Sequence, residues 1–173
     1  LLYSIGVAKM DDAIRKAALV GRGQKETDMQ DRVRRFWEEE VRHKLRSHAV
    51  ECIETHRAAG HHLAILTSSS NYLSAYAAAH WNIPHVLANH FVVVDDVFTG
   101  EMVEPICFGE GKLAHARALA EQLGVALEDC IFYTDSYSDY PAMVAMGRPI
   151  AVHPDRRLAR AARKHEWDIE YWA

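Results

Sequence analysis

The chain has 173 residues, of which 49% are apolar and 25% are charged, and its formal net charge is −4. This length suits one domain with at most a small appendage, and the composition is that of an ordinary globular protein. The charge gives no reason to expect a nucleic-acid or membrane partner, and no apolar stretch is long enough to span a bilayer. The first residues lack the basic flank and apolar segment of a signal peptide, so we expect a cytoplasmic protein.

The three cysteines and eleven histidines show no spacing typical of disulfides or metal sites. An odd number of widely separated cysteines predicts small buried thiols in a reducing compartment. His80, His85 and His90 fall five residues apart, which would scatter them around any helix. We expect all the histidines to lie at the surface or at its boundary.

The first third of the chain predicts helices. The first is expected to run from Lys9 or Met10 to Val20, where a Gly-Arg-Gly loop follows. The second, over residues 28–45, has apolar residues three and four apart in one stripe, with charged residues opposite. The third begins with Ser47 as its N-cap and ends before Gly60, since glycine favours the left-handed conformation that terminates helices.

After Gly60 strands and helices alternate. The expected strands are residues 62–66, a β-rich stretch over 86–103 with a turn at Asp95-Asp96, and residues 130–133, 149–152 and 168–169. The expected helices are residues 71–80, 109–123, 138–146 and 155–165. This alternation predicts an α/β fold with a doubly wound, mostly parallel sheet. We place the only domain boundary near residues 43–47, where the all-helical sequence ends.

The segment from Tyr133 to Ala142 carries the strongest functional signal. The apolar run before it predicts a buried parallel strand, and a turn that holds Asp135 and Asp139 follows at once. Open α/β sheets bind ligands at the carboxyl ends of their strands, and two carboxylates on one such turn suit a hard cation such as Mg²⁺. The same two residues also fit as caps of the helix that follows.

Two more polar segments are expected at this edge of the sheet. Thr67 and Ser68 follow the strand over 62–66, and Lys112 lies near the start of the helix over 109–123. Phosphoryl transfer requires such groups, because the charge on the non-bridging oxygens must be neutralised. Each segment alone also fits a polar turn or a solvated lysine. Their order and spacing favour the phosphate interpretation.

These segments resemble three motifs of the haloacid dehalogenase superfamily, in the branch close to phosphoserine phosphatase. Residues 64–69 are similar to the second motif, a strand that ends in Thr or Ser. Residues 105–112 resemble the segment that carries the third-motif lysine, and residues 132–141 resemble the fourth motif. The similarity covers residues 42–172.

The resemblance implies a Mg²⁺-dependent phosphatase that acts on a small phosphorylated metabolite through an aspartyl-phosphate intermediate. Its core would be a Rossmann-like sheet over residues 44–173 that lacks its first strand. Residues 1–43 would form a small helical cap, incomplete on its N-terminal side, that closes over the substrate and excludes water.

The resemblance also implies roles for individual residues. Thr67 would bind the phosphate through its hydroxyl, and Ser68 would bind it through its backbone N–H. Lys112 would neutralise the phosphate and the attacking carboxylate. Asp135 would bind Mg²⁺, and Asp139 would bind it directly or through water while it holds Lys112 in place.

Two features depart from the family pattern. The first motif, Asp-x-Asp, which supplies the nucleophile and the general acid and base, is absent, and Asp11-Asp12 lies in a helical pattern with no strand before it. We therefore expect the nucleophile upstream of residue 1, and the chain alone to be inactive. The alternative is a non-catalytic binding or regulatory module, or an inactive fragment. Ser138 also stands where this branch often carries Asn.

Two other interpretations are disfavoured. A receiver domain is also doubly wound with clustered acids, but the long helical start and the late acid pair argue against it. The basic residues over 156–164 suggest nucleic-acid binding, yet they flank Leu158, Ala161 and Ala162 at helical spacing. That pattern favours a solvated helix face above a packed one.

Overall fold

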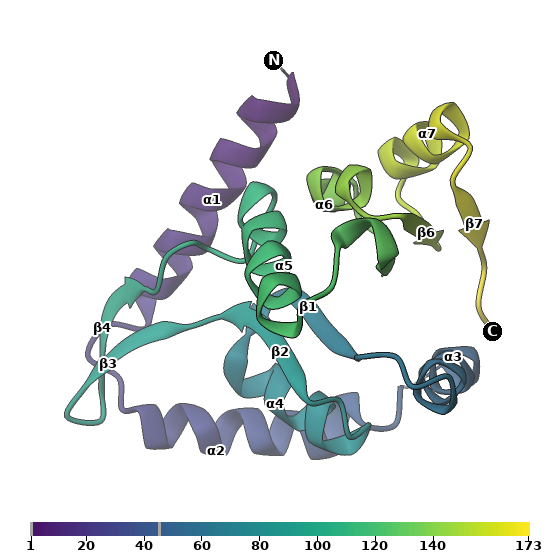
Figure 1. The fold of residues 1–173 in the computed structure, drawn as a ribbon. Coiled ribbons are helices and arrows are strands. Elements are labelled where there is room, and N and C mark those ends of the chain that lie inside the picture. Colours follow the sequence, from purple (N-terminus) through teal and green to yellow (C-terminus); the bar gives the residue numbers. More distant parts are fainter. Residues whose placement is uncertain (1, 45) are drawn as a thin grey trace.

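The structure, a computed structural model, describes residues 2–44 and 46–173, with side chains from Met10 onward (Figure 1). Helices and strands alternate as the sequence predicts, which confirms the α/β fold. The helices are α1 (Leu2–Val20), α2 (Glu26–Phe36), α3 (Ser47–Ala58), α4 (Asn71–His80), α5 (Glu110–Leu123), α6 (Tyr140–Ala145) and α7 (Arg156–His165). The strands are β1 (Ala64–Ser70), β2 (His85–Asn89), β3 (Phe91–Val94), β4 (Val97–Met102), β5 (Ile131–Thr134), β6 (Arg148–Val152) and β7 (Asp168–Glu170).

The parallel strands form two sheets in the described part of the chain. One pairs β1 with β2, and the other has the order β5-β6-β7. In Figure 1, α4 lies beside the first sheet, and α6 and α7 lie on one side of the second. The sequence predicted a single sheet, but β1 and β5 have no hydrogen bonds to each other. The parallel pairing is as expected, and the division leaves each of these two strands with an unpaired edge.

The expected helix over residues 28–45 is shorter in the structure. α2 ends at Phe36, and a π-helical turn, Trp37–Val41, follows it. The extra residue of such a turn shifts the apolar stripe around the helix. Trp37, which is 4% exposed, stacks on Tyr76 and meets His80 of α4 edge-on. Phe36, predicted to face inward, is 50% exposed.

Other boundaries also differ, and α1 begins at Leu2 instead of at residue 9 or 10. Ser47 is the first residue of α3 and not its cap, which is Arg46, while Gly60 has the predicted positive φ of 76°. The strand expected to end at residue 66 continues to Ser70, whose hydroxyl accepts a hydrogen bond from Leu73 and caps α4. A single helix was expected over residues 138–146; instead, a 3₁₀ turn (Tyr137–Asp139) precedes α6.

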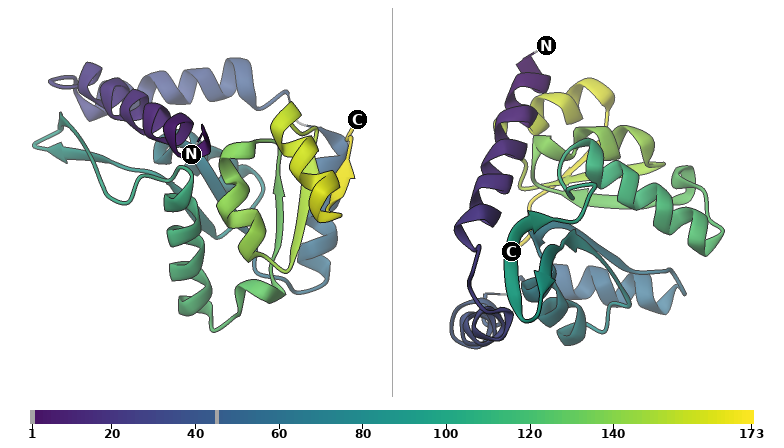
Figure 2. Two further views of the ribbon diagram at one scale, coloured as in Figure 1. Left: turned by 90° about the horizontal axis from the view of Figure 1, so that it is seen from above. Right: turned by 90° about the vertical axis from the view of Figure 1, so that its left-hand side faces the viewer.

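The β3–β4 hairpin projects from the body of the molecule beside the C-terminal end of α1 (Figure 2). Its turn is at Asp95-Asp96, as predicted, and both residues have positive φ. Backbone hydrogen bonds join Gly23 and Glu26 to the hairpin. α2 lies against α4, so the helices predicted as a cap contact the hairpin and one core helix. The division into residues 1–43 and 44–173 stays a prediction.

A core of fully buried residues lies where α6, β6 and α7 meet, made by Met143, Ala151, Leu158 and Ala162. Asp155 caps α7 by accepting hydrogen bonds from the backbone N–H groups of Arg157 and Leu158. Its other carboxylate oxygen accepts from the backbone N–H of Tyr137. Burial favours a higher pKa for Asp155, but these backbone groups outweigh it and hold the pKa below its ordinary value. The cap therefore also fixes the turn that follows β5.

Within the described residues, no helix is both long enough and apolar enough for a transmembrane span.

Candidate functional site

Lys112 and Asp139 form a buried ion pair. Lys112 lies in the first turn of α5, and Asp139 ends the 3₁₀ turn after β5. The lysine Nζ is 2.8 Å from Asp139 Oδ2, and the two side chains are 8% and 3% exposed. Burying either charge without its partner would cost roughly several kcal/mol of desolvation free energy. Because the ion pair offsets this cost, each side chain holds the other in place. Lys112 is therefore not a solvated surface lysine.

Both carboxylate oxygens of Asp139 accept hydrogen bonds from protein groups. Its Oδ2 also accepts a hydrogen bond from Thr134 Oγ1 at 2.7 Å, and its Oδ1 accepts from Ser138 Oγ at 3.1 Å. Asp135 is different, because its exposed carboxylate has no hydrogen bond or ion pair with the described part of the chain. Its backbone carbonyl accepts from the N–H of Asp155 at 2.8 Å, which orders the turn. The two acids thus have distinct surroundings.

Thr67 and the ion pair of Lys112 and Asp139 all lie near Cys107, which is 0% exposed. Burial raises the pKa of the Cys107 thiol to about 11, although the Lys112 charge and a backbone hydrogen bond from Thr67 favour the thiolate. The thiol also donates to the Leu87 carbonyl at 3.4 Å. The three segments that the sequence placed at one edge of the sheet therefore meet around this buried thiol.

Asn89, which the sequence analysis did not single out, ties two of these segments together. Its side-chain amide donates to the Ser68 carbonyl at 2.8 Å and accepts from the Cys107 N–H at 2.8 Å. The residue is 3% exposed, and both of its bonds satisfy backbone groups near the site. The signal in the sequence was a polar residue at the carboxyl end of the apolar strand β2.

Gly111, next to Lys112, is also required by the geometry. A Cβ at this position would lie 1.8 Å from the backbone oxygen of Ile106. Only glycine lets the first turn of α5 approach the preceding segment this closely. The position of Lys112 therefore depends on a backbone contact that the sequence alone did not reveal.

Arg15 of α1 pairs with Glu104, in the segment that leads to α5. A hydrogen bond from Arg15 lowers the pKa of the Glu104 carboxyl, and the same bond raises the pKa of the guanidinium. Both side chains are about half exposed, so the pair contributes little stability. It does place the predicted cap beside the segment that carries Lys112.

Of the two carboxylates at the carboxyl end of β5, that of Asp135 suits a magnesium ion better than that of Asp139. Mg²⁺ keeps several waters and takes one or two carboxylates, and Asp135 offers an exposed one at the carboxyl end of β5. Asp139 is already occupied by three donors, which suits the holding of Lys112 better than direct metal binding. The described residues hold no group of three or more His, Cys, Asp or Glu placed for a metal ion. Other ligands would have to complete the site.

Comparison with known proteins identifies the family. The family model described as haloacid dehalogenase-like hydrolase matches residues 1–144, most of the chain. The chain belongs to this family. The resemblance that the three motifs suggested is thereby confirmed.

Relatives within the haloacid dehalogenase-like family include proteins named as phosphatases. The chain is 32% identical over 134 residues to phosphoserine phosphatase SerB1 of Mycobacterium tuberculosis, covering 78% of this chain and 44% of that protein. It is 33% identical over 121 residues to the probable phosphatase Rv3661 of the same species, covering 70% and 42%. The chain therefore spans less than half the length of these curated relatives.

A solved structure shares the fold over nearly the whole chain. It is a protein of unknown function from Bordetella pertussis Tohama I, with a TM-score of 0.84 and 26% identity. The match covers 91% of this chain and 72% of that one. The arrangement of α1, the hairpin and the two parallel sheets therefore has a counterpart in an experimental structure.

Proposed function

We propose that this chain forms most of the active site of a Mg²⁺-dependent phosphomonoester hydrolase that acts on a small phosphorylated metabolite. The observation that carries the proposal is the buried pair of Lys112 and Asp139, 2.8 Å apart, close to the segment of Thr67 and Ser68. A buried ammonium held by a carboxylate at the edge of a parallel sheet is a fixed positive charge for an anionic substrate. The phosphatases among the relatives support the same reaction class.

Three groups would bind the phosphoryl group. The Thr67 hydroxyl oxygen accepts a hydrogen bond from the Ser69 N–H at 3.1 Å, so its own hydrogen can be donated to a phosphate oxygen. The backbone N–H of Ser68 would be a second donor. Lys112 has three N–H donors, and the one that points at Asp139 leaves two for the substrate. Asp139 would keep the amine oriented throughout the reaction.

Asp135 is the proposed ligand of the metal, with Asp139 in contact with it through water. Bound Mg²⁺ would supply charge neutralisation at the phosphoryl oxygens. The exposed carboxylate of Asp135 requires no rearrangement to take this role, since no described residue competes for it. Asp139 would have to release a protein donor before it could bind a metal directly.

The groove between β1 and β5 is the proposed place of the nucleophile. A cavity of about 680 Å³ is lined by both strands and by α3 and α5, with side chains such as Ile65, Leu66 and Phe132. β1 and β5 each lack a partner on one edge among the described strands. One parallel strand from a segment before residue 1 would pair with both edges, and its carboxyl end would emerge beside Thr67 and Asp135.

An aspartate at that strand end would carry out the covalent chemistry. Its carboxylate oxygen would attack phosphorus, and the P–O bond to the substrate would break as the leaving alkoxide takes a proton from a second acid. Water would then attack the phosphorus of the aspartyl-phosphate, release inorganic phosphate and restore the carboxylate. Lys112 would stabilise the charge of the phosphoryl oxygens in both steps.

Asp135→Asn tests this proposal in the gene product read from its own start codon. Hydrolysis of p-nitrophenyl phosphate with excess Mg²⁺ is expected to fall by about a hundredfold or more, because a neutral amide is a poor ligand for Mg²⁺. Asp95→Asn is the matched control, since Asp95 is an exposed acid of the hairpin turn, and its turnover should stay unchanged. Normal turnover by Asp135→Asn would refute the metal assignment. Phosphate binding without turnover in the unaltered protein would indicate a binding module.

A further inference from the structure

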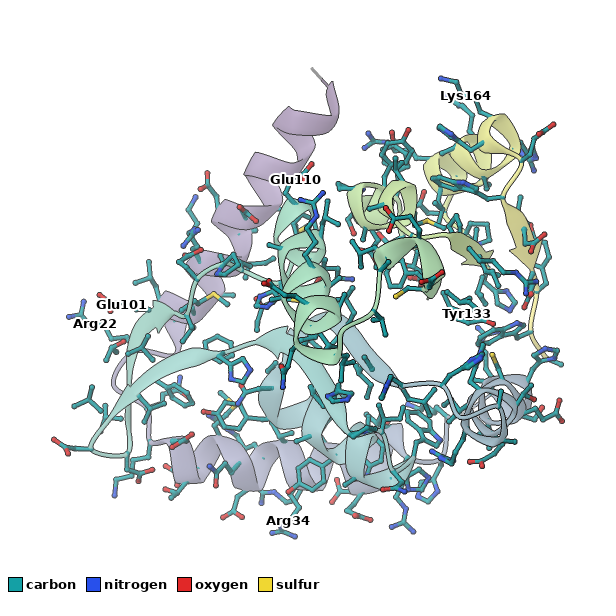
Figure 3. All side chains as sticks on the ribbon, viewed as in Figure 1. Arg22, Arg34, Glu101, Glu110, Tyr133 and Lys164 are labelled. Carbon is teal, nitrogen blue, oxygen red and sulfur yellow. The ribbon has the colours of Figure 1, made fainter. Side chains whose placement is uncertain are left out.

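A second concave site lies outside the edge that carries Lys112. Its cavity of about 630 Å³ is bounded by α7 and by the turn after β5, and its lining residues are Tyr137, Tyr140, Arg157, Arg160, Ala161, Lys164 and His165. We call it the α7 pocket. Figure 3 shows Lys164 on the outer side of α7, far from Tyr133, which lies on the side that faces α3. The α7 pocket is thus separate from the groove between β1 and β5.

The α7 pocket is positively charged. Arg157, Arg160 and Lys164 follow one another at intervals of three and four residues, so they lie along one side of the helix. No acidic side chain lines the pocket, and these three cations form no ion pair with the described part of the chain. The carboxylates nearest in the chain are Asp155 and Glu166, each two residues from a cation of the pocket. Asp155 already accepts three backbone hydrogen bonds and is attracted electrostatically by Arg157, which leaves Arg160 and Lys164 as the less compensated charges.

Helix stability does not account for this charge. Basic residues favour the C-terminal end of a helix, where they offset the macrodipole, and Lys164 and His165 fit that role. Arg157 and Arg160 lie in the first half of α7, where positive charge gains nothing from the dipole. The face that packs on the core is separate and apolar, since Leu158 and Ala162 are fully buried.

Aromatic rings form the rest of the pocket wall. The Tyr137 and Tyr140 rings are 5.2 Å apart, and the Arg157 guanidinium lies 4.5 Å above the Tyr137 ring. The Tyr140 hydroxyl is 2.9 Å from His165 Nε2. These contacts fix the wall before any ligand binds. Arg157 lies over the Tyr137 ring, which also packs against the core, so Tyr140 and the aliphatic parts of arginine and lysine are the groups that can accept a flat aromatic group. The cationic ends can accept phosphate.

We propose that the α7 pocket binds a nucleotide. Its phosphates would lie along Arg157, Arg160 and Lys164, and its base would pack against the tyrosine wall. The seven residue steps from Arg157 to Lys164 span about 10 Å along a helix, a length that suits a di- or triphosphate better than a single phosphate. Because Tyr137 and Tyr140 bracket Asp139 in the sequence, the ligand would contact the same turn that holds Lys112.

Calorimetric titration tests this proposal with the gene product read from its own start codon, in EDTA to remove Mg²⁺. The probe is adenosine 5′-(β,γ-imido)triphosphate, and tripolyphosphate and adenosine are titrated in parallel. We expect the nucleotide to bind more tightly than tripolyphosphate, and adenosine to show no measurable binding. Thr67→Ala should bind the nucleotide as well as the unaltered protein does, since Thr67 belongs to the other site.

The matched variants lie on the same helix. Arg160→Glu/Lys164→Glu is expected to weaken nucleotide binding at least about tenfold, because two phosphate contacts are reversed in sign. Arg156→Glu/Arg163→Glu makes the same change in net charge with residues that do not line the pocket, and binding should change less than about threefold. Arg160→Gln/Lys164→Gln repeats the test without adding acids, and circular dichroism verifies that each variant is folded.

Three results would overturn the proposal. Equal losses in the two double glutamate variants would show that only the overall charge attracts the probe. Equal affinity for tripolyphosphate and the nucleotide would show that the base makes no contact. Tighter binding of a single-stranded oligonucleotide than of the nucleotide would make α7 a nucleic-acid surface.

Discussion

Replacing Lys112 with methionine is expected to lower the free energy of unfolding by about 3–5 kcal/mol, because it leaves the Asp139 carboxylate buried without a counter-charge. In the gene product read from its own start codon, the same change should reduce phosphomonoester hydrolysis by at least about a hundredfold, since the fixed positive charge near the phosphoryl group is lost. Chemical denaturation gives the first quantity, and steady-state kinetics with p-nitrophenyl phosphate gives the second.

The double variant Lys112→Met/Asp139→Asn separates these two effects. An asparagine at position 139 is neutral. Its carbonyl oxygen can still accept the hydrogen bond that Thr134 donates to Oδ2, and its NH2 group can donate to the Ser138 hydroxyl, whose hydrogen bond to Oδ1 is reversed. Most of the lost stability should return because no buried charge remains unpaired, while hydrolysis should stay low. A single Lys112→Met variant within about 1 kcal/mol of the unaltered protein would show that the pair is not buried as described.

Gly111→Ala is expected to destabilise the protein by about 3 kcal/mol or more, the upper part of the range for overpacked sites. The added Cβ would lie 1.8 Å from the Ile106 backbone oxygen, and a backbone atom cannot move aside as a side chain can. The start of α5 must therefore shift, and Lys112 shifts with it. Thermal or chemical unfolding measures the first effect, and a parallel loss of phosphatase activity reports the second.

Gly21→Ala provides the control for this substitution. There the new Cβ would lie 3.3 Å from the Ala18 oxygen, and Gly21 has no positive φ. Unfolding should change by less than about 1 kcal/mol, which a small shift of the loop can absorb. Equal losses in the two variants would mean that the contact at Gly111 has no special role.

The sequence predicted the features of this protein that depend on local patterns. α4 begins and ends at the predicted residues, because a serine run supplies its cap and alanines fill its interior. The hairpin turn at Asp95-Asp96 and the positive φ of Gly60 follow from residue preference alone. The candidate site was predictable since its polar residues follow apolar strands, and parallel strands bring their carboxyl ends to one edge.

The features that the sequence did not predict depend on contacts between distant segments. The π-helical turn turns Trp37 toward α4, and no local pattern encodes that partner. Asn89 and Gly111 matter because of backbone groups that the fold brings near them. The α7 pocket forms where α7 meets the turn after β5, and these two segments are separated in the sequence by β6.

A crystal structure of the gene product read from its own start codon, with Mg²⁺ and tungstate as a phosphate analogue, would show whether the three segments bind one phosphate group. We predict that the anion lies within hydrogen-bond distance of Thr67 Oγ1, the Ser68 N–H and Lys112 Nζ, while Asp135 binds the metal. Lys112 should still contact Asp139. An anion bound elsewhere, or a Lys112 amine turned away from Asp139 with no anion beside it, would refute the proposed phosphate site.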